Sequence, residues 1–258
     1  MIVSEDLIRR IERSEAGRVA SSAKAFGGDV VQVAGGVASF CGEGNVMTQC
    51  VGVGSDGEPS KADIERIAAH YRGRCSVFEF KLSTVSAHRL RKWVVRRAKS
   101  LPEFETLLVR SLSDFVPSEV ALELREVTPE DALAYAERSA SRFFTGDAPP
   151  GLVEVIAASC VGPDVRSYEA YVDGKPAAGC SLGFADGIAW LGGAAVDPEY
   201  RGRGIHRQMQ AYRLATAKEM GFELACQGAL AGSLSQQNAQ RIGFDIAFTR
   251  PTFLIEPA

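Results

Sequence analysis

The chain has 258 residues, of which 46% are hydrophobic and 24% charged, and its formal net charge at pH 7 is -3. These values describe a well-cored globular chain with one large domain or two small ones, and they exclude a basic protein that attracts nucleic acid or anionic lipid. No stretch approaches the roughly twenty apolar residues of a membrane span and the first residues do not resemble a signal peptide, so we predict a cytoplasmic protein.

The first half of the chain mixes helical and extended patterns. Apolar residues at helical spacing predict helices, and short apolar runs predict strands. In order, we expect a helix at 5–24, apolar strands within 29–40 and 46–54, a helix near 61–71, a strand at 75–80, a basic helix near 85–98 and a strand at 104–112.

A glycine-rich segment, Gly52–Gly57, follows one of these strands and matches Gly-x-Gly-x-x-Gly, with Glu79 about twenty residues later. This pattern is typical of a dinucleotide site. However, residues 58–60 separate the glycines from the next helix, and Asp56 and Glu58 bring negative charge to the place of a phosphate. The dinucleotide interpretation is therefore the weaker one.

The basic helix carries six Lys or Arg residues within the eleven positions from Arg89 to Lys99. A nucleic-acid contact is one interpretation. The other is an amphipathic helix, because Leu90, Trp93 and Val94 share one face and the charges lie elsewhere. We favour the amphipathic helix, since a charge run on a helix is usually a solvated face.

The second half begins after a polar segment, Ser111–Ser118, which we interpret as an inter-domain connection. Leu122–Arg125 is a predicted strand. A helix is then predicted to start with Thr128 as its cap and Pro129 in its first position.

Three further strands are predicted at Ser167–Val172, Pro176–Phe184 and Ile188–Val196. They are separated by Asp173-Gly174 and Asp186-Gly187, dipeptides that suit tight hairpin turns. The three strands should form an antiparallel meander.

A helix should follow this meander, because Ile205, Met209 and Tyr212 recur on one face and Gly221 stands beyond as a left-handed cap. The segment that leads into it, Val196–Ile205, carries two glycines between arginines. A helix N-terminus offers unpaired N–H groups and a partial positive charge, and glycines let phosphate oxygens approach them. This junction therefore predicts a pyrophosphate site.

The junction resembles the acyl-coenzyme-A loop of the GNAT superfamily of N-acetyltransferases, whose pattern is Arg or Gln, two residues, Gly, one residue, then Gly or Ala. Arg201 and Gly204 fit this pattern, whereas His206 departs from it. The resemblance is strong over Leu122–Phe253 and weak before it.

The resemblance implies an α/β (α+β) fold with two tandem GNAT-like domains, each a central mixed, mostly antiparallel sheet flanked by helices. Residues 1–116 would be a degenerate copy that binds no cofactor, with Gly52–Gly57 at the position of its phosphate loop. Residues 117–258 would be the acetyl-CoA-binding catalytic domain.

The chemistry that the resemblance implies is direct attack of a primary amine, on a small molecule or a peptide, on the thioester of acetyl-CoA in a ternary complex. Ser235 and Asn238 enter the prediction because they belong to a Ser-Gln-x-Asn run before Gly243-Phe244, although helix capping by Ser233 or Ser235 is an equal alternative. The predicted coenzyme contacts are Ala194, Ala195, Val196, Arg201, Gly202, Arg203, Gly204, Ile205, His206, Ser235 and Asn238.

The groups that move protons are less well defined. No acid lies on Ile188–Val196, so Glu169 or a water is the candidate general base, and Glu169 could equally be a surface carboxylate. Ala239 stands where the family often has a tyrosine that protonates the leaving thiolate. A non-catalytic acyl-CoA-binding sensor or scaffold therefore remains the alternative function.

The remaining expectations concern partners. Six cysteines are scattered without a Cys-x-x-Cys pair, so we expect no metal site. We expect an amine acceptor as the partner, no nucleic acid and no membrane, in a monomer or homodimer.

Overall fold

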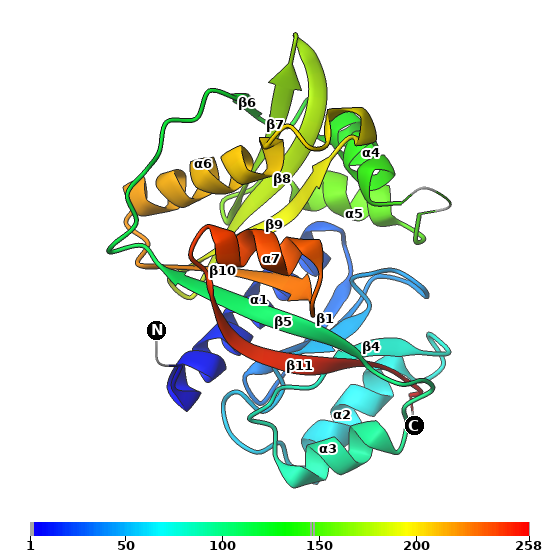
Figure 1. Ribbon diagram of the computed structural model, residues 1–258. Helices are drawn as coiled ribbons and strands as arrows, with labels where there is room; N and C mark the ends of the chain where they lie inside the picture. Colours follow the sequence, from blue (N-terminus) through cyan, green and yellow to red (C-terminus); the bar gives the residue numbers. More distant parts are fainter. Residues whose placement is uncertain (1–2, 145, 147, 258) are drawn as a thin grey trace.

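The computed structural model describes residues 3–144, 146 and 148–257 (Figure 1). Its helices are α1 (Glu5–Ala25), α2 (Lys61–Tyr71), α3 (His88–Val95), α4 (Ala132–Phe143), α5 (Leu152–Ser159), α6 (Ile205–Glu219) and α7 (Leu234–Arg241). Its strands are β1 (Asp29–Val33), β2 (Gly36–Phe40), β3 (Gln49–Val51), β4 (Phe78–Lys81), β5 (Glu103–Ser111), β6 (Glu123–Glu126), β7 (Val165–Val172), β8 (Lys175–Ala185), β9 (Ile188–Val196), β10 (Leu224–Leu230) and β11 (Asp245–Ile255).

Within the described residues these strands form one eleven-stranded sheet in the order β1-β2-β3-β4-β11-β5-β10-β9-β8-β7-β6. The pairings β3·β4 and β9·β10 are parallel, and the others are antiparallel. The predicted mixed, mostly antiparallel arrangement is confirmed, with the sheets of the two halves joined into one.

The two halves exchange strands at the centre of this sheet. β11, the last strand of the chain, lies between β4 and β5, while β5 lies between β11 and β10 (Figure 1). Each half therefore completes its sheet with a strand from the other.

The halves also repeat one topology on either side of the β5·β11 pair. The strands β2, β3 and β4 follow one another with the same antiparallel and parallel pairings as β8, β9 and β10. α2 connects the parallel pair in the first half and α6 connects it in the second. This repetition agrees with the predicted tandem fold.

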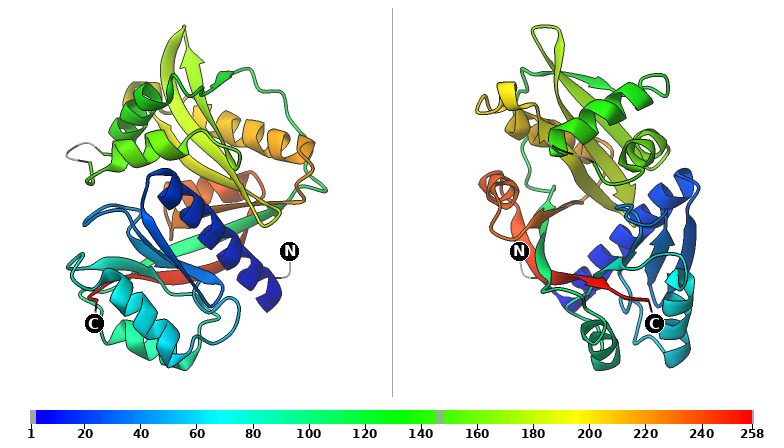
Figure 2. Two further views of the ribbon diagram at one scale, coloured as in Figure 1. Left: turned by 180° about the vertical axis from the view of Figure 1, so that it is seen from behind. Right: turned by 90° about the vertical axis from the view of Figure 1, so that its right-hand side faces the viewer.

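Helices cover both faces of the sheet (Figure 2). Because side chains alternate along a strand, neighbouring residues of β5 identify the two layers. Leu108 packs in the cluster that contains Met209 of α6, whereas Leu107 packs with Ile11 of α1. α2 and α3 lie on the side of α6, and α1 crosses the opposite side, where it contacts α5.

Several local predictions agree with the structure. α2 has the predicted bounds. Asp173, Gly174, Asp186 and Gly187 all have positive φ, as the tight turns of the meander require.

One local expectation was wrong, and some elements were not expected. The helix predicted to start at Thr128 begins at Ala132, because Thr128 closes a turn by donating its hydroxyl to Asp131 (3.1 Å). α5, β10 and β11 were not predicted at all.

The predicted connection Ser111–Ser118 runs from the end of β5 into a stretch without helix or strand. The proposed division into residues 1–116 and 117–258 is compatible with this course and stays a prediction. The outer limits of that division, residues 1 and 258, lie outside the described residues.

Candidate active site

The loop between β9 and α6 is shaped by two glycines. Gly202 has φ 78° and Gly204 has φ 75°, in the left-handed region that residues with a Cβ rarely adopt. A Cβ at either position would meet no atom within 4 Å, so the backbone conformation, and not space, requires glycine. These residues lead the chain from a 3₁₀ turn at Pro198–Tyr200 into the first turn of α6.

The N-terminus of α6 is open. Its N-cap residue is Gly204, and no side chain caps it. The first helical bond joins the N–H of Gln208 to the carbonyl oxygen of Gly204 (3.1 Å). The N–H groups of Ile205, His206 and Arg207 therefore have no partner within the helix and form the positive end of its dipole, which is suited to an anion.

Two exposed arginines add full positive charge to this loop. Arg201 donates to the carbonyl oxygen of Val196 (3.1 Å), and Arg203 donates to that of Glu199 (3.3 Å). The guanidinium of Arg203 also lies over the ring of Tyr200. Both cations are thus held beside the helix end.

A cavity of about 410 Å³ opens at this helix end, and we call it the loop cavity. Nine of the eleven predicted coenzyme contacts line it: Ala194, Ala195, Val196, Arg201, Gly202, Gly204, Ile205, His206 and Asn238. Arg203 lines a neighbouring cavity between α6 and residues 118–121 instead, and Ser235 lines neither. No Asp or Glu is among the described residues that line the loop cavity, whereas Arg201, Arg207 and Arg241 are. Its charge therefore suits an anionic ligand.

One wall of the loop cavity is the end of β9, where the sheet divides. β9 pairs with β10 only through Ile188, Ala189 and Trp190. Beyond Trp190 the two strands separate, so among the described residues the backbone of 191–196 has no strand partner on the side of β10. Gly193 adds an irregularity there, with φ 56°. Backbone groups of β9 thus stay available to a ligand in the opening.

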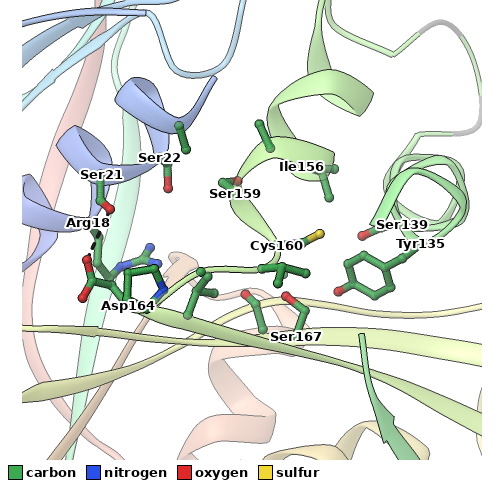
Figure 3. A pocket seen from close by; sticks show the side chains of 18 of the residues that line it. Arg18, Ser21, Ser22, Tyr135, Ser139, Ile156, Ser159, Cys160, Asp164 and Ser167 are labelled. Atoms are coloured by element: carbon green, nitrogen blue, oxygen red, sulfur yellow. Dashed lines mark hydrogen bonds between the residues drawn. The ribbon is translucent and has the colours of Figure 1, made fainter. Parts of the chain in front are cut away.

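A second cavity, of about 240 Å³, lies on the face of the sheet that α1, α4 and α5 cover (Figure 3). We call it the serine-lined cavity, because its walls include Ser21, Ser22, Ser139, Ser159, Ser167 and Ser181. Gly193 also lines it, and the next residue, Ala194, lines the loop cavity. The two cavities therefore approach the same point of β9 from different sides.

Residues 133–244 match the model of the acetyltransferase (GNAT) family. No curated protein matches the chain by sequence. A GCN5-related N-acetyltransferase from Kribbella flavida has a similar structure, with a TM-score of 0.66, 17% identity, and coverage of 98% of this chain and 96% of that chain.

A tandem GNAT protein from the clavulanic acid biosynthesis pathway has a TM-score of 0.55 at 18% identity, over 80% of this chain and 70% of that chain. An acetyltransferase of the GNAT family from Novosphingobium aromaticivorans, described as putative in its own name, has a TM-score of 0.54 at 16% identity, over 78% and 83%.

Residues 133–244 form a GNAT acetyltransferase domain. The activity shown at the level of this family is acetyl transfer, and the solved structures establish the fold, including its tandem form.

Within the GNAT domain, Arg213 of α6 is a buried cation that the sequence analysis missed. Its Nη1 donates to the carbonyl oxygens of Ser181 (2.9 Å) and Gly192 (3.0 Å), and its Nε donates to that of Met209 (3.2 Å). It therefore joins α6 to β8 and β9 where their register shifts. Burial lowers the pKa of Arg213. Its place four residues after Met209, on the buried face of the helix, was a signal in the sequence.

His206 lines the loop cavity of the GNAT domain at the position where the family pattern has Gly or Ala. Burial, aided by the charge of Arg213, lowers the pKa of His206 to about 4. The imidazole is therefore neutral near pH 7.

Glu169 is buried, and basic side chains surround it. Arg138 donates to both of its oxygens (2.7 Å each), Arg142 donates to one of them (3.3 Å) and Tyr171 to the other (3.3 Å). Arg142 also donates to Asp197 (3.1 Å), at the start of the loop between β9 and α6. Glu169 lines neither the loop cavity nor the serine-lined cavity, so the geometry offers no support for the expectation that it is the general base.

The helix α7 contains the predicted Ser-Gln-x-Asn run. Ser233 is its N-cap, because the Ser233 hydroxyl accepts from the N–H of Gln236 (3.3 Å). Asn238 lines the loop cavity and accepts from Arg241 (2.9 Å). The buried methyl group of Ala239 cannot donate a proton, as the sequence predicts.

The first half differs from the GNAT domain at the equivalent helix end. Ser60 and Asp63 form a capping box at the start of α2: the Asp63 N–H donates to the Ser60 hydroxyl (3.1 Å), and the Ser60 N–H donates to the Asp63 carboxylate (2.9 Å). The backbone N–H groups at the start of α2 are therefore partly occupied by the capping box, whereas the equivalent groups of α6 have no partner in their helix. The Asp63 carboxylate also places a negative charge at the start of α2. This end is poorly suited to a phosphate.

The glycine segment of the first half has a packing role. A Cβ on Gly52 would lie 2.7 Å from the backbone oxygen of Glu12 in α1. The N–H groups of Gly54 and Asp56 both donate to the carbonyl oxygen of Ala34 (3.0 and 3.2 Å). These contacts explain the pattern without a dinucleotide.

The basic helix α3 is amphipathic. Leu90 and Val94 are fully buried, and the Trp93 ring meets that of Phe80 edge-on. Arg89, Arg91, Lys92 and Arg96 are exposed. The preferred interpretation of this charge run, a buried stripe with solvated charges, is confirmed.

The described part of the chain shows neither a membrane span nor a metal cluster. No helix in it has the length and apolarity needed to span a membrane. No three His, Cys, Asp or Glu residues in it are grouped so that they could hold a metal ion.

Proposed function

We propose that this protein is an acetyl-CoA-dependent N-acetyltransferase that acts on a primary amine of a small molecule or peptide. The observation that carries the proposal is that two cavities reach β9 at consecutive residues, Gly193 and Ala194. The loop cavity would hold the coenzyme and the serine-lined cavity the amine. Both substrates would then be present together, as direct transfer requires.

The residues of the loop cavity fit a coenzyme with a pyrophosphate. The uncapped N–H groups of Ile205, His206 and Arg207 would hold phosphate oxygens, and Arg201 would add a charge-assisted contact. Because His206 is neutral, this contribution comes from its backbone. The side of Ala194–Val196 that faces away from β8 would align the pantetheine arm.

When bound, acetyl-CoA supplies an activated acetyl group as a thioester. In the transfer, the amine nitrogen forms a bond to the acetyl carbon, the carbon–sulfur bond breaks, the nitrogen loses a proton and the thiolate gains one. The backbone N–H groups at the end of β9 would donate to the oxygen as negative charge develops on it. Arg213 would keep these groups in position through its bonds to Ser181 and Gly192.

Proton removal from the amine needs a base other than Glu169, whose carboxylate is occupied by arginines. We propose that Glu169 is a positioning residue that holds Asp197, at the base of the loop, through Arg142. Water in the serine-lined cavity would accept the proton.

The alternative function is a non-catalytic acyl-CoA-binding sensor or scaffold. The observation in its favour is Ala239, which leaves no acid where the family often has a tyrosine. Tyr200 is the one residue with a hydroxyl among the described residues that line the loop cavity. If Tyr200 and water cannot protonate the thiolate, turnover would be lost while binding persists.

Two measurements on the full chain test these functions. Calorimetric titration with acetyl-CoA should give one site per chain, because a capping box closes the start of α2, the helix of the first half that is equivalent to α6. Thiol release with a panel of primary amines should then separate an enzyme from a sensor. Binding without thiol release from any amine favours the sensor, and absence of binding contradicts both functions.

A further inference from the structure

The serine-lined cavity is built by both halves of the chain. α1 of the first half contributes Arg18 to it, and the second half contributes Asp164 in the turn before β7 (Figure 3). Burial raises the pKa of the Cys160 thiol to about 11 and raises that of Tyr135, so both are neutral near pH 7. Arg18 and Asp164 are therefore the charged groups among the described residues that line the cavity.

Arg18 lacks an anion. Its guanidinium lies 5.2 Å from the ring centre of Trp190, and its buried Nε has no hydrogen-bond partner. No carboxylate of the described residues forms an ion pair with it. A largely buried cation without a partner is costly, and a ligand anion would relieve that cost.

Two carboxylates act electrostatically on Arg18, and both of them already form ion pairs with other cations. Glu15 and Glu105 attract Arg18 electrostatically. Both of them form ion pairs with Arg250, and Lys81 binds Glu15 (3.1 Å) as well. Glu12 and Glu79 belong to the same cluster, in which four carboxylates face the two cations Arg250 and Lys81. Arg18 stands beside this cluster, at the wall of a cavity, without a direct ion pair to any of the described acids.

We propose that the amine acceptor also carries a carboxylate, and that Arg18 binds this carboxylate in the serine-lined cavity. This inference rests on the proposed acetyltransferase function and adds a substrate class to it. A guanidinium matches a carboxylate with two parallel hydrogen bonds, which gives selectivity as well as affinity.

The position of Arg18 also sets a spacing within the acceptor. Trp190, which Arg18 covers, precedes Gly193 by three residues on β9, or about 10 Å along an extended strand. An α-amino acid is too short to place its carboxylate at one point and its amine at the other. An ω-amino acid, or the side-chain amine of a longer amino acid, has the required length.

Asp164 extends this inference to the head group of an amino acid. Its carboxylate lies at the same end of the cavity as Arg18 and accepts a hydrogen bond from Ser21 (3.5 Å) (Figure 3). An α-ammonium group beside the bound carboxylate would face it. Lysine, acetylated on its side-chain nitrogen, should therefore be a better acceptor than 6-aminohexanoate, which lacks the α-ammonium group.

The test uses two acceptors that differ only in charge, 6-aminohexanoate and 6-aminohexanamide, with thiol release from acetyl-CoA as the readout. For the native chain, kcat/KM should favour the acid by at least tenfold, because a charge-assisted contact is lost with the amide. Arg18→Met should bring the ratio of kcat/KM for the acid to that for the amide close to one. Arg18→Lys should keep part of the preference for the acid. Lys24→Met, which removes an exposed cation from the same helix outside the cavity, should leave the ratio unchanged.

A second readout does not depend on turnover. The chain has two tryptophans, so a Trp93→Phe variant reports on Trp190 alone. Addition of 6-aminohexanoate should change its fluorescence, and Arg18→Met should abolish the change. Thermal melting checks that each variant is folded.

The outcomes separate the inference from the proposed function. Equal transfer to acid and amide, or a preference that survives in folded Arg18→Met, overturns the role of Arg18 and leaves the acetyltransferase function standing. A fluorescence change that depends on Arg18, without transfer to any amine, supports the anion site and contradicts the enzyme. Neither transfer nor a fluorescence change contradicts both.

Discussion

Replacement of Gly204 by glutamate tests the phosphate site most directly. A residue with a Cβ at φ 75° adopts a left-handed conformation that costs about 1–2 kcal/mol. The Cβ itself meets no atom within 4 Å, so no steric cost is added. Gly204→Ala measures this conformational cost alone, and we expect its melting temperature to fall by roughly 2–8 °C in a chain of this size.

Gly204→Glu adds a carboxylate at the same position. A negative charge at a helix N-terminus is favourable to the folded protein by about 0.3–1 kcal/mol, so this variant should be no less stable than Gly204→Ala. It also stands where the pyrophosphate should bind, and like charges brought together in a binding site cost several kcal/mol. If this repulsion lowers the binding free energy by about 2 kcal/mol, the affinity for acetyl-CoA should fall about 30-fold below that of the alanine variant.

Calorimetric titration of the two variants with acetyl-CoA, with melting curves for both, makes the comparison. The reasoning is refuted if folded Gly204→Glu binds acetyl-CoA within threefold of Gly204→Ala. The pyrophosphate would then lie away from the N-terminus of α6.

Three further predictions concern neighbouring residues. Arg201→Ala should weaken acetyl-CoA binding about tenfold, less than Gly204→Glu, because the helix N–H groups remain; an equal or larger loss in calorimetry would mean that the arginine dominates. Glu169→Gln should lower the free energy of unfolding by about 1–3 kcal/mol through its buried arginine partner and leave the shape of the pH–rate profile unchanged; loss of the acidic limb of that profile would restore Glu169 as the base. His206 has a folded pKa of about 4 against 6.5 when unfolded, so its contribution to stability is complete above pH 6.5 and falls as the pH drops toward 4. The native chain should lose about 2 kcal/mol of unfolding free energy between pH 7 and pH 5 through His206, and His206→Asn should not show this loss. If the melting temperatures of the native chain and of His206→Asn fall equally between these two pH values, the prediction is contradicted.

Local features of the sequence predicted the elements around the site well. The Asp-Gly turns need a backbone conformation that few other dipeptides adopt, so the meander could be located from short-range chemistry. The glycines at 202 and 204 gave the open helix end for the same reason. At Thr128 a side chain able to cap a helix closes a turn instead, because the same hydroxyl suits both.

Contacts distant in sequence were not predictable in this way. The residue patterns of β5 and β11 do not indicate which strands they pair with. The sequence therefore did not predict that β5 joins the sheet of the second half and β11 the sheet of the first. Arg18 lies on a helix of the first half, so its place in a cavity of the second half depends on the packing of α1 across the sheet. The contacts of Arg213 with Ser181 and Gly192 were missed too, although the helical spacing already placed this cation on the buried face of α6.

The exchange of β5 and β11 has a consequence for biosynthesis. β11 is synthesised after every other strand of the sheet, yet it lies near the middle of that sheet. Until it emerges, β4 and β5 each present an unpaired edge, which is a template for pairing with other chains. The sheet of the first half therefore cannot be completed until β11 has been made, and its long-range pairing predicts slow folding. Deletion of the eleven residues of β11 should then disrupt the half that was synthesised first.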